Sequence, residues 1–315
     1  MWMNRRRAMA TLAGILLAGV SLGEAWAQAK PKIALVQINQ QALFFNQMNE
    51  GAQKAADAAG AELVIFNANN DPAAQNNAIE TYVNDKVSGI IIVAIDTNGV
   101  MPAVEAADKA GIPVVAVDAI LPEGPQKAQI GVDNEQAGRL IGEHFVKFVE
   151  DKMGGKATLG IVGALNSTIQ NIRQKGFEDV VKANANVTMA GVADGRNVQE
   201  NALAAAENLI TANPNLTALY ATGEPALLGA VAAVESQGKQ DQIKVVGWDL
   251  TAQAIKGIDA GYVGGVIQQD PAGMGAAAVE ALVKVIKGGA VERNIAVPVT
   301  IVTKENVEPY RAVFQ

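Results

Sequence analysis

The chain has 315 residues, one histidine, no cysteine and a formal net charge of −7. The missing cysteines exclude disulfide bonds and a thiol nucleophile, and a single histidine excludes a metal site built from several imidazoles. An acidic chain with scattered charge is a poor nucleic-acid binder, because affinity for phosphate requires clustered Lys and Arg side chains. Composition thus indicates an acidic globular protein.

The first 27 residues are predicted to be a secretory signal peptide. Three arginines at 5–7 precede an apolar run over 8–22, and Ala25-Trp26-Ala27 has the small-x-small pattern of a cleavage site. The run is short for a membrane span, with an uncleaved anchor as the alternative. Both Sec and twin-arginine export remain open. Cleavage leaves 22 basic and 31 acidic residues, a net charge of −9, so we expect a soluble exported protein.

Short apolar runs alternate with helical patterns along the chain. The first half predicts strands at 32–38, 61–67, 89–95 and 112–118, with helices over 46–59, 73–86 and 100–110. The second half predicts strands at 156–163, 187–194, 216–223 and 243–249, with helices over 169–183, 198–212, 225–237 and 252–260. Nearly continuous hydrophobic runs suit strands covered on both faces, and strand–helix alternation predicts parallel sheets. The two series therefore predict two similar doubly wound α/β domains.

Aromatic and polar side chains follow the predicted strands. In open parallel sheets a ligand binds at the carboxyl ends of the strands, so the residues there are candidates for a binding site. They include Phe44, Phe45, Asp118, Arg173, Arg196, Trp248, Asp249 and Gln269. A flat ring stacks on the C–H face of a sugar, while carboxylate, amide and guanidinium groups hydrogen-bond its hydroxyls. The set predicts a carbohydrate site.

Each candidate also has a structural interpretation. The two phenylalanines and Trp248 are apolar enough to belong to the core. Asp249 is placed to cap the helix that begins near Ala252, and Arg173 suits a solvated helix face. Their shared location at one end of two sheets favours binding, because independent core roles do not predict it.

An enzyme is the weaker interpretation. The chain lacks the G-x-S-x-G pattern and the glycine patterns that bind phosphates or dinucleotides. His144 falls inside a predicted helix, which favours a structural role. Asp118 and Asp249 could in principle be the acid and base of a glycosidase, but each serves more simply as a hydroxyl acceptor. We predict no catalytic residue, no metal and no cofactor.

Seven stretches carry a family likeness: ALFFNQMNEGAQKAADAAG, IPVVAVD, IGVDNEQAG, IRQKGFED, NPNLTALYATGEPALLGAVAAV, IKVVGWD and VIQQDPAGMG. Together they resemble the ribose-binding-protein type of periplasmic solute-binding protein, over about 30–302. The resemblance implies two α/β lobes joined by three crossovers near 130–133, 267–269 and 298–301. The implied lobes are 28–131 plus 270–297, and 132–268 plus 298–315, with the ligand in the cleft between them.

The resemblance also implies a role for each candidate. Phe44 and Phe45 match a pair of phenylalanines, one or both of which stack on the sugar, and Trp248 matches an aromatic residue that closes the sandwich from the other lip. Four residues match groups that hydrogen-bond the hydroxyls: Asp118, Arg173, Asp249 and Gln269.

Five positions depart from the ribose pattern: Ala42, Ala94, Ala119, Gly195 and Gly223. Each replaces a polar or aromatic residue, and losing a hydrogen bond to a buried hydroxyl costs about 1–3 kcal/mol. Replacement contacts are expected from Gln37, Asn39, Gln41, Asn98, Asn166, Arg196, Glu224 and Gln268. We therefore predict a monosaccharide or polyol other than ribose.

In function, the resemblance implies a periplasmic, monomeric protein that closes around one sugar and delivers it to the membrane permease of an ABC importer. The alternative is a sensor that presents a sugar or a furanosyl quorum signal to a chemoreceptor or sensor kinase. A transcriptional regulator of related fold is disfavoured by the signal peptide and by the lack of a basic helix-turn-helix segment.

Overall fold

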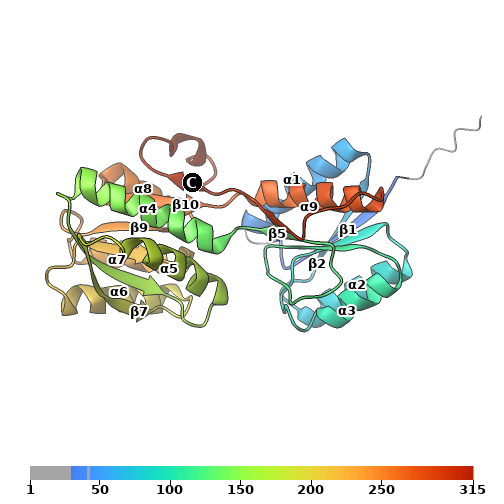
Figure 1. The fold of residues 1–315 in the computed structure, drawn as a ribbon, viewed down its shortest axis with the longest axis horizontal. Helices are drawn as coiled ribbons and strands as arrows, with labels where there is room; N and C mark the ends of the chain where they lie inside the picture. Colours follow the sequence, from blue (N-terminus) through green and yellow to red (C-terminus); the bar gives the residue numbers. More distant parts are fainter. Residues whose placement is uncertain (1–29, 41–42, 315) are drawn as a thin grey trace, which may run out of the picture. The chain divides into compact units, whose positions relative to one another are not determined.

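The computed structural model describes residues 30–40 and 43–314 (Figure 1). The predicted signal peptide, 1–27, lies outside the described residues. Residues from Pro31 onward form one unit, which holds the two α/β domains with their parallel sheets. Within the described ranges, no helix has the length and apolar character needed to cross a membrane.

In the described part of the chain, the first sheet has six parallel strands. They are β1 (Lys32–Gln37), β2 (Glu62–Asn67), β3 (Gly89–Ile92), β4 (Val114–Val117), β5 (Ala128–Gly131) and β11 (Asn294–Ala296). Their order is β11-β5-β4-β3-β1-β2, so the chain starts inside the sheet and winds outward to both sides. The central strands β3 and β4 are rich in Val and Ile because both of their faces are covered.

The second sheet repeats this winding. Its strands are β6 (Ala157–Gly163), β7 (Val187–Asp194), β8 (Ala218–Ala221), β9 (Lys244–Trp248), β10 (Val263–Gln268) and β12 (Thr300–Val302), in the order β12-β10-β9-β8-β6-β7. All neighbours are parallel except β12, which runs antiparallel to β10. The prediction of parallel sheets therefore fails at this one edge, because the last strand enters from the other sheet in the opposite direction.

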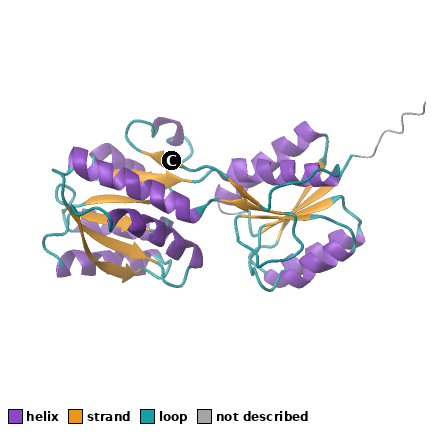
Figure 2. Ribbon diagram, in the orientation of Figure 1, coloured by secondary structure: helices purple, strands orange, loops and turns teal. Residues whose placement is uncertain are grey.

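Helices connect the strands and cover both faces of each sheet (Figure 1, Figure 2). They are α1 (Leu43–Ala59), α2 (Pro72–Asn84), α3 (Met101–Lys109), α4 (Asn134–Lys152), α5 (Thr168–Val181), α6 (Gln199–Ala212), α7 (Glu224–Ser236), α8 (Ala252–Ala260) and α9 (Pro271–Ile286). A short 3₁₀ helix, η1 (Glu308–Tyr310), lies near the end of the chain.

The side chains of β1 show how the core is divided. Ile33 and Leu35 pack with α1 and α9 on one face of the sheet, whereas Ala34 and Val36 pack with α2 and α3 on the other. This alternation is the two-residue period of a strand, and all four side chains are buried. The second sheet likewise has α4 and α5 on one face and α6, α7 and α8 on the other. Because helices pack on both faces of each sheet, the carboxyl ends of its strands are held in fixed positions.

The chain passes between the sheets three times. It leaves the first sheet after β5 to begin α4, returns after β10 to begin α9, and leaves again between β11 and β12. These passages match the crossovers expected near 130–133, 267–269 and 298–301. The exact lobe limits, 28–131 plus 270–297 and 132–268 plus 298–315, stay a prediction.

Two glycines bring α4 and α5 into close contact. A Cβ atom on Gly138 would lie 2.3 Å from the backbone oxygen of Arg173, and one on Gly176 would lie 2.2 Å from that of Glu135. Neither position has room for even a methyl group, because contacts between carbon and oxygen atoms that are not bonded to each other are ordinarily well beyond 3 Å. The backbone contact between these helices therefore fixes where α5, and Arg173 on it, lies over the sheet.

Candidate ligand-binding site

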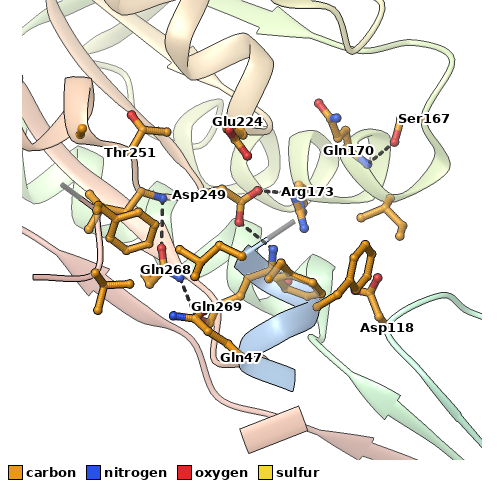
Figure 3. Close-up of a pocket in the computed structure, with 18 residues that line it drawn as sticks. Gln47, Asp118, Ser167, Gln170, Arg173, Glu224, Asp249, Thr251, Gln268 and Gln269 are labelled. Carbon is orange, nitrogen blue, oxygen red and sulfur yellow. Dashed lines mark hydrogen bonds and ion pairs between the residues drawn. The ribbon is translucent and has the colours of Figure 1, made fainter. Parts of the chain in front are cut away.

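A cavity of about 680 Å³ lies at the carboxyl ends of the strands and has walls from both sheets (Figure 3). That volume is in the range of small-molecule sites. The lining residues are Leu43, Phe44, Phe45, Gln47, Asp118, Ser167, Ile169, Gln170, Arg173, Glu224, Asp249, Leu250, Thr251, Ala252, Gln268, Gln269, Val313 and Phe314. Six of the seven residues to which the resemblance gives a role in binding are among them, and the seventh, Trp248, is not.

Asp118 and Asp249 occupy equivalent places in the two sheets. Each is the first residue after a strand, β4 or β9, and each has a left-handed backbone, with φ of 65° and 62°. Each backbone N–H donates to a neighbouring strand, at 2.8 Å to the carbonyl oxygen of Ile130 or Ile267. Aspartate tolerates this conformation better than most residues. The turn ends the strand and directs each carboxylate into the cavity, where both residues line the wall.

Arg173 is the cation among the described residues of the cavity wall, and it is held from several sides. Its Nε donates to Oδ1 of Asn134 at 2.9 Å, and its Nη1 donates to the carbonyl oxygen of Thr222 at 3.4 Å. Nη1 also lies 3.5 Å from Oδ2 of Asp249, whose Oδ1 accepts from Nε2 of Gln269 at 2.7 Å (Figure 3). With a side chain only 8% exposed, Arg173 is a pre-positioned donor rather than a solvated surface residue.

Trp248 is buried beneath Arg173 rather than exposed to the cavity. The guanidinium carbon of Arg173 lies 3.9 Å from the centroid of its ring, and its Nε1 donates to the hydroxyl of Tyr220 at 2.8 Å. Trp248 is 0% exposed and packs in the core of the second sheet. In this arrangement the indole supports the guanidinium by a cation–π contact and does not reach a ligand. The stacking role expected for Trp248 gets no support from this geometry.

Phe44 and Phe45 lie side by side in the first turn of α1. Their ring centroids are 5.4 Å apart with an interplanar angle of 85°, an edge-to-face pair. Both side chains are half-buried and both line the cavity. They also pack against the core of the first sheet, so the binding and core interpretations both apply to the pair.

The acidic side chains of the cavity influence one another. Burial is the main cause that raises the pKa of Asp118 to about 6; Arg173 opposes this shift and Asp249 adds to it. Burial first, and Asp249 second, also raise the pKa of Glu224. Both carboxylates are thus easier to protonate than free side chains, because an anion in a confined, acidic space is poorly solvated.

The secondary candidates divide into two groups. Glu224 and Gln268 line the cavity, and the amide of Gln268 accepts from the N–H of Leu250 at 3.1 Å and donates to the carbonyl oxygen of Gln269 at 2.9 Å. Gln268 therefore holds the loop after β9 in place. Glu224 lies in the first turn of α7, where a carboxylate is favoured by the helix dipole.

The other secondary candidates that the structure describes are not among the residues that line the cavity. Gln37 is fully buried and donates to Oδ1 of Asn49 at 3.0 Å. Asn98 is exposed on the loop before α3, and Asn166 donates to the carbonyl oxygen of Arg196 at 3.3 Å. Arg196 itself lines a separate hollow beside α6. Gln41 lies outside the described residues.

Several wall residues were not identified from the sequence. Ser167 and Thr251 cap α5 and α8 and line the cavity at the same time. Gln170 fills the space beside Gly223, where a Cβ would lie 2.8 Å from its Cδ. A serine or threonine just before a helical pattern predicts a helix cap, and this signal was present in the sequence for both Ser167 and Thr251. Val313 and Phe314 offered none, because nothing local indicates that the end of the chain reaches the site.

No metal site is evident in the part of the chain that the structure describes, where no group of three or more His, Cys, Asp or Glu side chains is placed to hold an ion. His144 lies away from the cavity, with Nε2 3.0 Å from the carbonyl oxygen of Gly264 and its ring stacked on Phe148. The cavity instead offers rings, amides, carboxylates and one guanidinium, which are suited to binding a polar organic molecule.

Comparisons with known proteins agree with this geometry. The model of the periplasmic binding protein domain matches residues 33–290. The ribose import binding protein of Escherichia coli is 31% identical over 304 residues, which cover 96% of this chain and all of that protein. A periplasmic solute-binding protein of an ABC transporter from Actinobacillus succinogenes, solved with bound D-allose, is 26% identical with a TM-score of 0.78, over 89% of this chain and 100% of that one.

A sugar-binding protein of an ABC transporter from Bacillus halodurans has a TM-score of 0.82 at 21% identity, over 89% of this chain and 100% of that one, and supports the fold. The match to the domain model spans most of the chain, and the solved structures share its fold. The chain therefore belongs to the periplasmic binding protein family, as a relative of the ribose import binding proteins.

Proposed function

We propose that this protein captures a monosaccharide or polyol in the periplasm and delivers it to the permease of an ABC importer. The observation that carries the proposal is the composition of the cavity wall, which combines two rings from α1 with polar groups from elements of the second sheet. Phe44 and Phe45 supply apolar surface for the C–H face of a sugar. Asp249 and Gln269, already bonded at 2.7 Å, supply a fixed pair for its hydroxyls.

Ligand binding in this proposal favours one arrangement of the two domains. Asp118 and the phenylalanines belong to elements of the first sheet, whereas Arg173 and Asp249 belong to elements of the second. A sugar that touches both groups stabilises the state in which they are close, and the three crossovers are the segments that absorb the motion. Closure would also remove water from the polar contacts and strengthen them.

The proposed ligand is not ribose. Positions that are polar in the ribose pattern are Ala94, Ala119 and Gly223 here, and a hydroxyl left without its partner weakens binding by about 1–3 kcal/mol. The names or titles of relatives of similar identity mention different ligands, namely D-ribose and D-allose, D-arabinose, or glycerol. The family architecture thus accommodates several carbohydrates, and the wall residues of this chain determine which one binds here.

A thermal-shift screen of the protein from residue 28 onward tests the binding step. The panel contains D-ribose, D-allose, D-arabinose, D-tagatose, D-galactose and glycerol, with hits measured by calorimetry. A ligand at 100 times its dissociation constant adds about 2.7 kcal/mol to the free energy of unfolding. We expect a hit other than ribose that Asp249→Ala abolishes and that Asp241→Ala, at an exposed position outside the cavity, leaves intact. Preferential binding of ribose would contradict the assignment of the ligand, and silence across the panel would contradict simple sugars as ligands.

Delivery to a permease needs its own experiment. Deleting the gene should abolish cellular uptake of the radiolabelled hit, and the wild-type gene on a plasmid should restore it. The Asp249→Ala gene should fail to restore uptake because its product no longer holds the ligand. Normal uptake in the deletion strain would show that binding serves another purpose.

A further inference from the structure

The first turn of α5 carries a sequence pattern whose usual contact is not formed. Ser167 and Gln170 have the spacing of a capping box, in which the glutamine side chain turns back to the backbone N–H of the serine. Ser167 does cap the helix, since its Oγ accepts from the N–H of Gln170 at 3.3 Å (Figure 3). Its own backbone N–H, however, donates to the carbonyl oxygen of Ala164 at 2.9 Å. The helix cap therefore does not use the side chain of Gln170.

The carboxamide of Gln170 instead connects the ends of two strands. Its Oε1 accepts from the hydroxyl of Thr222, after β8, at 2.7 Å, and its Nε2 donates to Oδ1 of Asn197, after β7, at 2.6 Å. Asn197 makes this contact from a left-handed backbone, with φ of 58°, a conformation that few residues other than glycine adopt. The two hydrogen bonds together fix the plane of the carboxamide.

Gly223 leaves open the space that this carboxamide occupies. A Cβ atom at position 223 would lie 2.8 Å from Cδ of Gln170 and 2.9 Å from both its Nε2 and its Oε1. The backbone of Gly223 is extended, with φ of −170°, so its conformation does not require a glycine. The place that a side chain at 223 would take is thus taken by Gln170.

Gln170 keeps unused hydrogen-bonding capacity beside the cavity. A carboxamide has two N–H donors and an oxygen with two lone pairs, and the bonds to Thr222 and Asn197 use one of each. None of the residues that the structure describes takes the others. Gln170 lines the cavity and is only 7% exposed, so a molecule in the cavity is the partner that can reach them.

We propose that Gln170 is a specificity-determining residue, which requires a hydroxyl group on the part of the ligand that faces it. Its remaining N–H and lone pair bind that group. Thr222 contacts both Gln170 and Arg173, through its hydroxyl and its carbonyl oxygen, so the two side chains belong to the same stretch of wall. A ligand with only C–H groups at that place leaves the carboxamide unpaired and is rejected. The inference rests on the proposed function, because it assigns a selective contact in the same cavity.

Sugars that lack single hydroxyls test this inference. The tightest binder among D-ribose, D-allose, D-arabinose, D-tagatose, D-galactose and glycerol is compared by calorimetry with each of its monodeoxy analogues. The proteins are the wild type and Gln170→Met, which keeps the length of the side chain without its hydrogen bonds. We expect loss of one particular hydroxyl to weaken binding about a hundredfold in the wild type but only about tenfold or less in Gln170→Met. Loss of any other hydroxyl should weaken both proteins equally.

Two further variants localise the effect. Gln174→Met is the matched control, since Gln174 lies one turn further along α5, is half-buried and is not among the residues that line the cavity. It should respond to every analogue as the wild type does. Gly223→Ala should reproduce the result of Gln170→Met, because the new methyl displaces the carboxamide. It also supplies the comparison if thermal unfolding shows that Gln170→Met does not fold.

The outcomes separate this inference from the proposed function. If each missing hydroxyl weakens the wild type and the variants at 170 and 223 by the same factor, Gln170 only connects the strand ends. The inference is then wrong, whereas sugar binding stands. If no sugar of the panel binds to the wild type, the proposed function fails and the inference fails with it.

Discussion

The guanidinium carbon of Arg173 lies over the buried indole of Trp248, 3.9 Å from the ring centroid. The indole is itself fixed, because its N–H donates to Tyr220, and Asn134 orients the guanidinium from the side. The cation of the cavity is therefore placed before any ligand arrives. Such preorganisation lowers the entropy lost on binding.

Replacing Arg173 should weaken both the fold and the site. Arg173→Ala removes a nearly buried donor and leaves Asn134 and Asp249 without it, so we expect the free energy of unfolding to fall by about 2–3 kcal/mol. Water should then reach Trp248, the single tryptophan of residues 28–315, and its emission should shift to the red. Arg173→Lys should show an intermediate result, because a lysine keeps the charge but not the planar fork.

Arg139→Ala is the control for this experiment. Arg139 forms ion pairs with Glu135 and Asp179 on the exposed side of α4 and α5, and exposed pairs contribute little. Equal losses of stability in the two variants, or unchanged emission in Arg173→Ala, would contradict the buried cation–π arrangement.

Asp118 should make stability depend on pH. Folding raises the pKa of this carboxyl from an ordinary 3.8 to about 6, chiefly by burial. Between these values the folded state binds more protons than the unfolded one, so the contribution of Asp118 to stability falls as pH rises through that window. Asparagine tolerates the same left-handed backbone. The free energy of unfolding of Asp118→Asn should therefore exceed that of the wild type by up to about 3 kcal/mol above pH 6, and by little below pH 4.

Urea titrations at several pH values measure this difference. Asp241→Asn provides the control, because Asp241 is exposed and forms no ion pair with the residues described. The free energy of unfolding of this variant should stay close to that of the wild type throughout the titrations. A constant difference between Asp118→Asn and the wild type across the range would mean that the carboxyl is not destabilised by burial.

Most of the fold could be predicted from the sequence because its signals are local. The run of four apolar residues in β3 and the Gly at the end of α1 each determine structure within a few neighbours. Strands 187–194 and helix 252–260 were predicted to the residue. The antiparallel β12 was missed, because its direction depends on a partner, β10, more than thirty residues earlier.

The site was less predictable, because a position after a strand does not say which way a side chain points. Asp118 and Asp249 line the cavity owing to their turned backbone, whereas Trp248, one residue before Asp249, faces the core by strand alternation. Gln37 faces inward for the same reason. Phe314 is the opposite case, since only the folded path of the last residues brings it to the cavity.

The contact between α4 and α5 gives a prediction at a distance from the cavity. In an open helix Gly→Ala stabilises by roughly 1 kcal/mol, but in Gly138→Ala the new methyl meets the backbone oxygen of Arg173 at 2.3 Å. Separating the two helices costs more than this gain, so we expect the free energy of unfolding to fall by about 1–3 kcal/mol. Ligand binding should also weaken, because Arg173 moves with α5. Asn77→Ala, on the exposed face of α2, should be neutral or slightly stabilising. Unchanged binding in Gly138→Ala would mean that α5 adjusts without moving Arg173.

The end of the chain should contribute to ligand binding. Val313 and Phe314 line the cavity, and the segment before them is anchored where Arg311 meets both carboxylate oxygens of Asp259 at 2.8 and 2.9 Å. Ending the chain after Ala312 keeps this anchor but removes two apolar wall residues, so we expect a small change in melting temperature and a roughly three- to tenfold loss of affinity for the sugar found in the screen. Calorimetry measures the affinity, and Phe314→Leu, which keeps an apolar side chain, should lose less. Equal affinity of the truncated and full-length proteins would show that the tail lies beside the ligand without touching it.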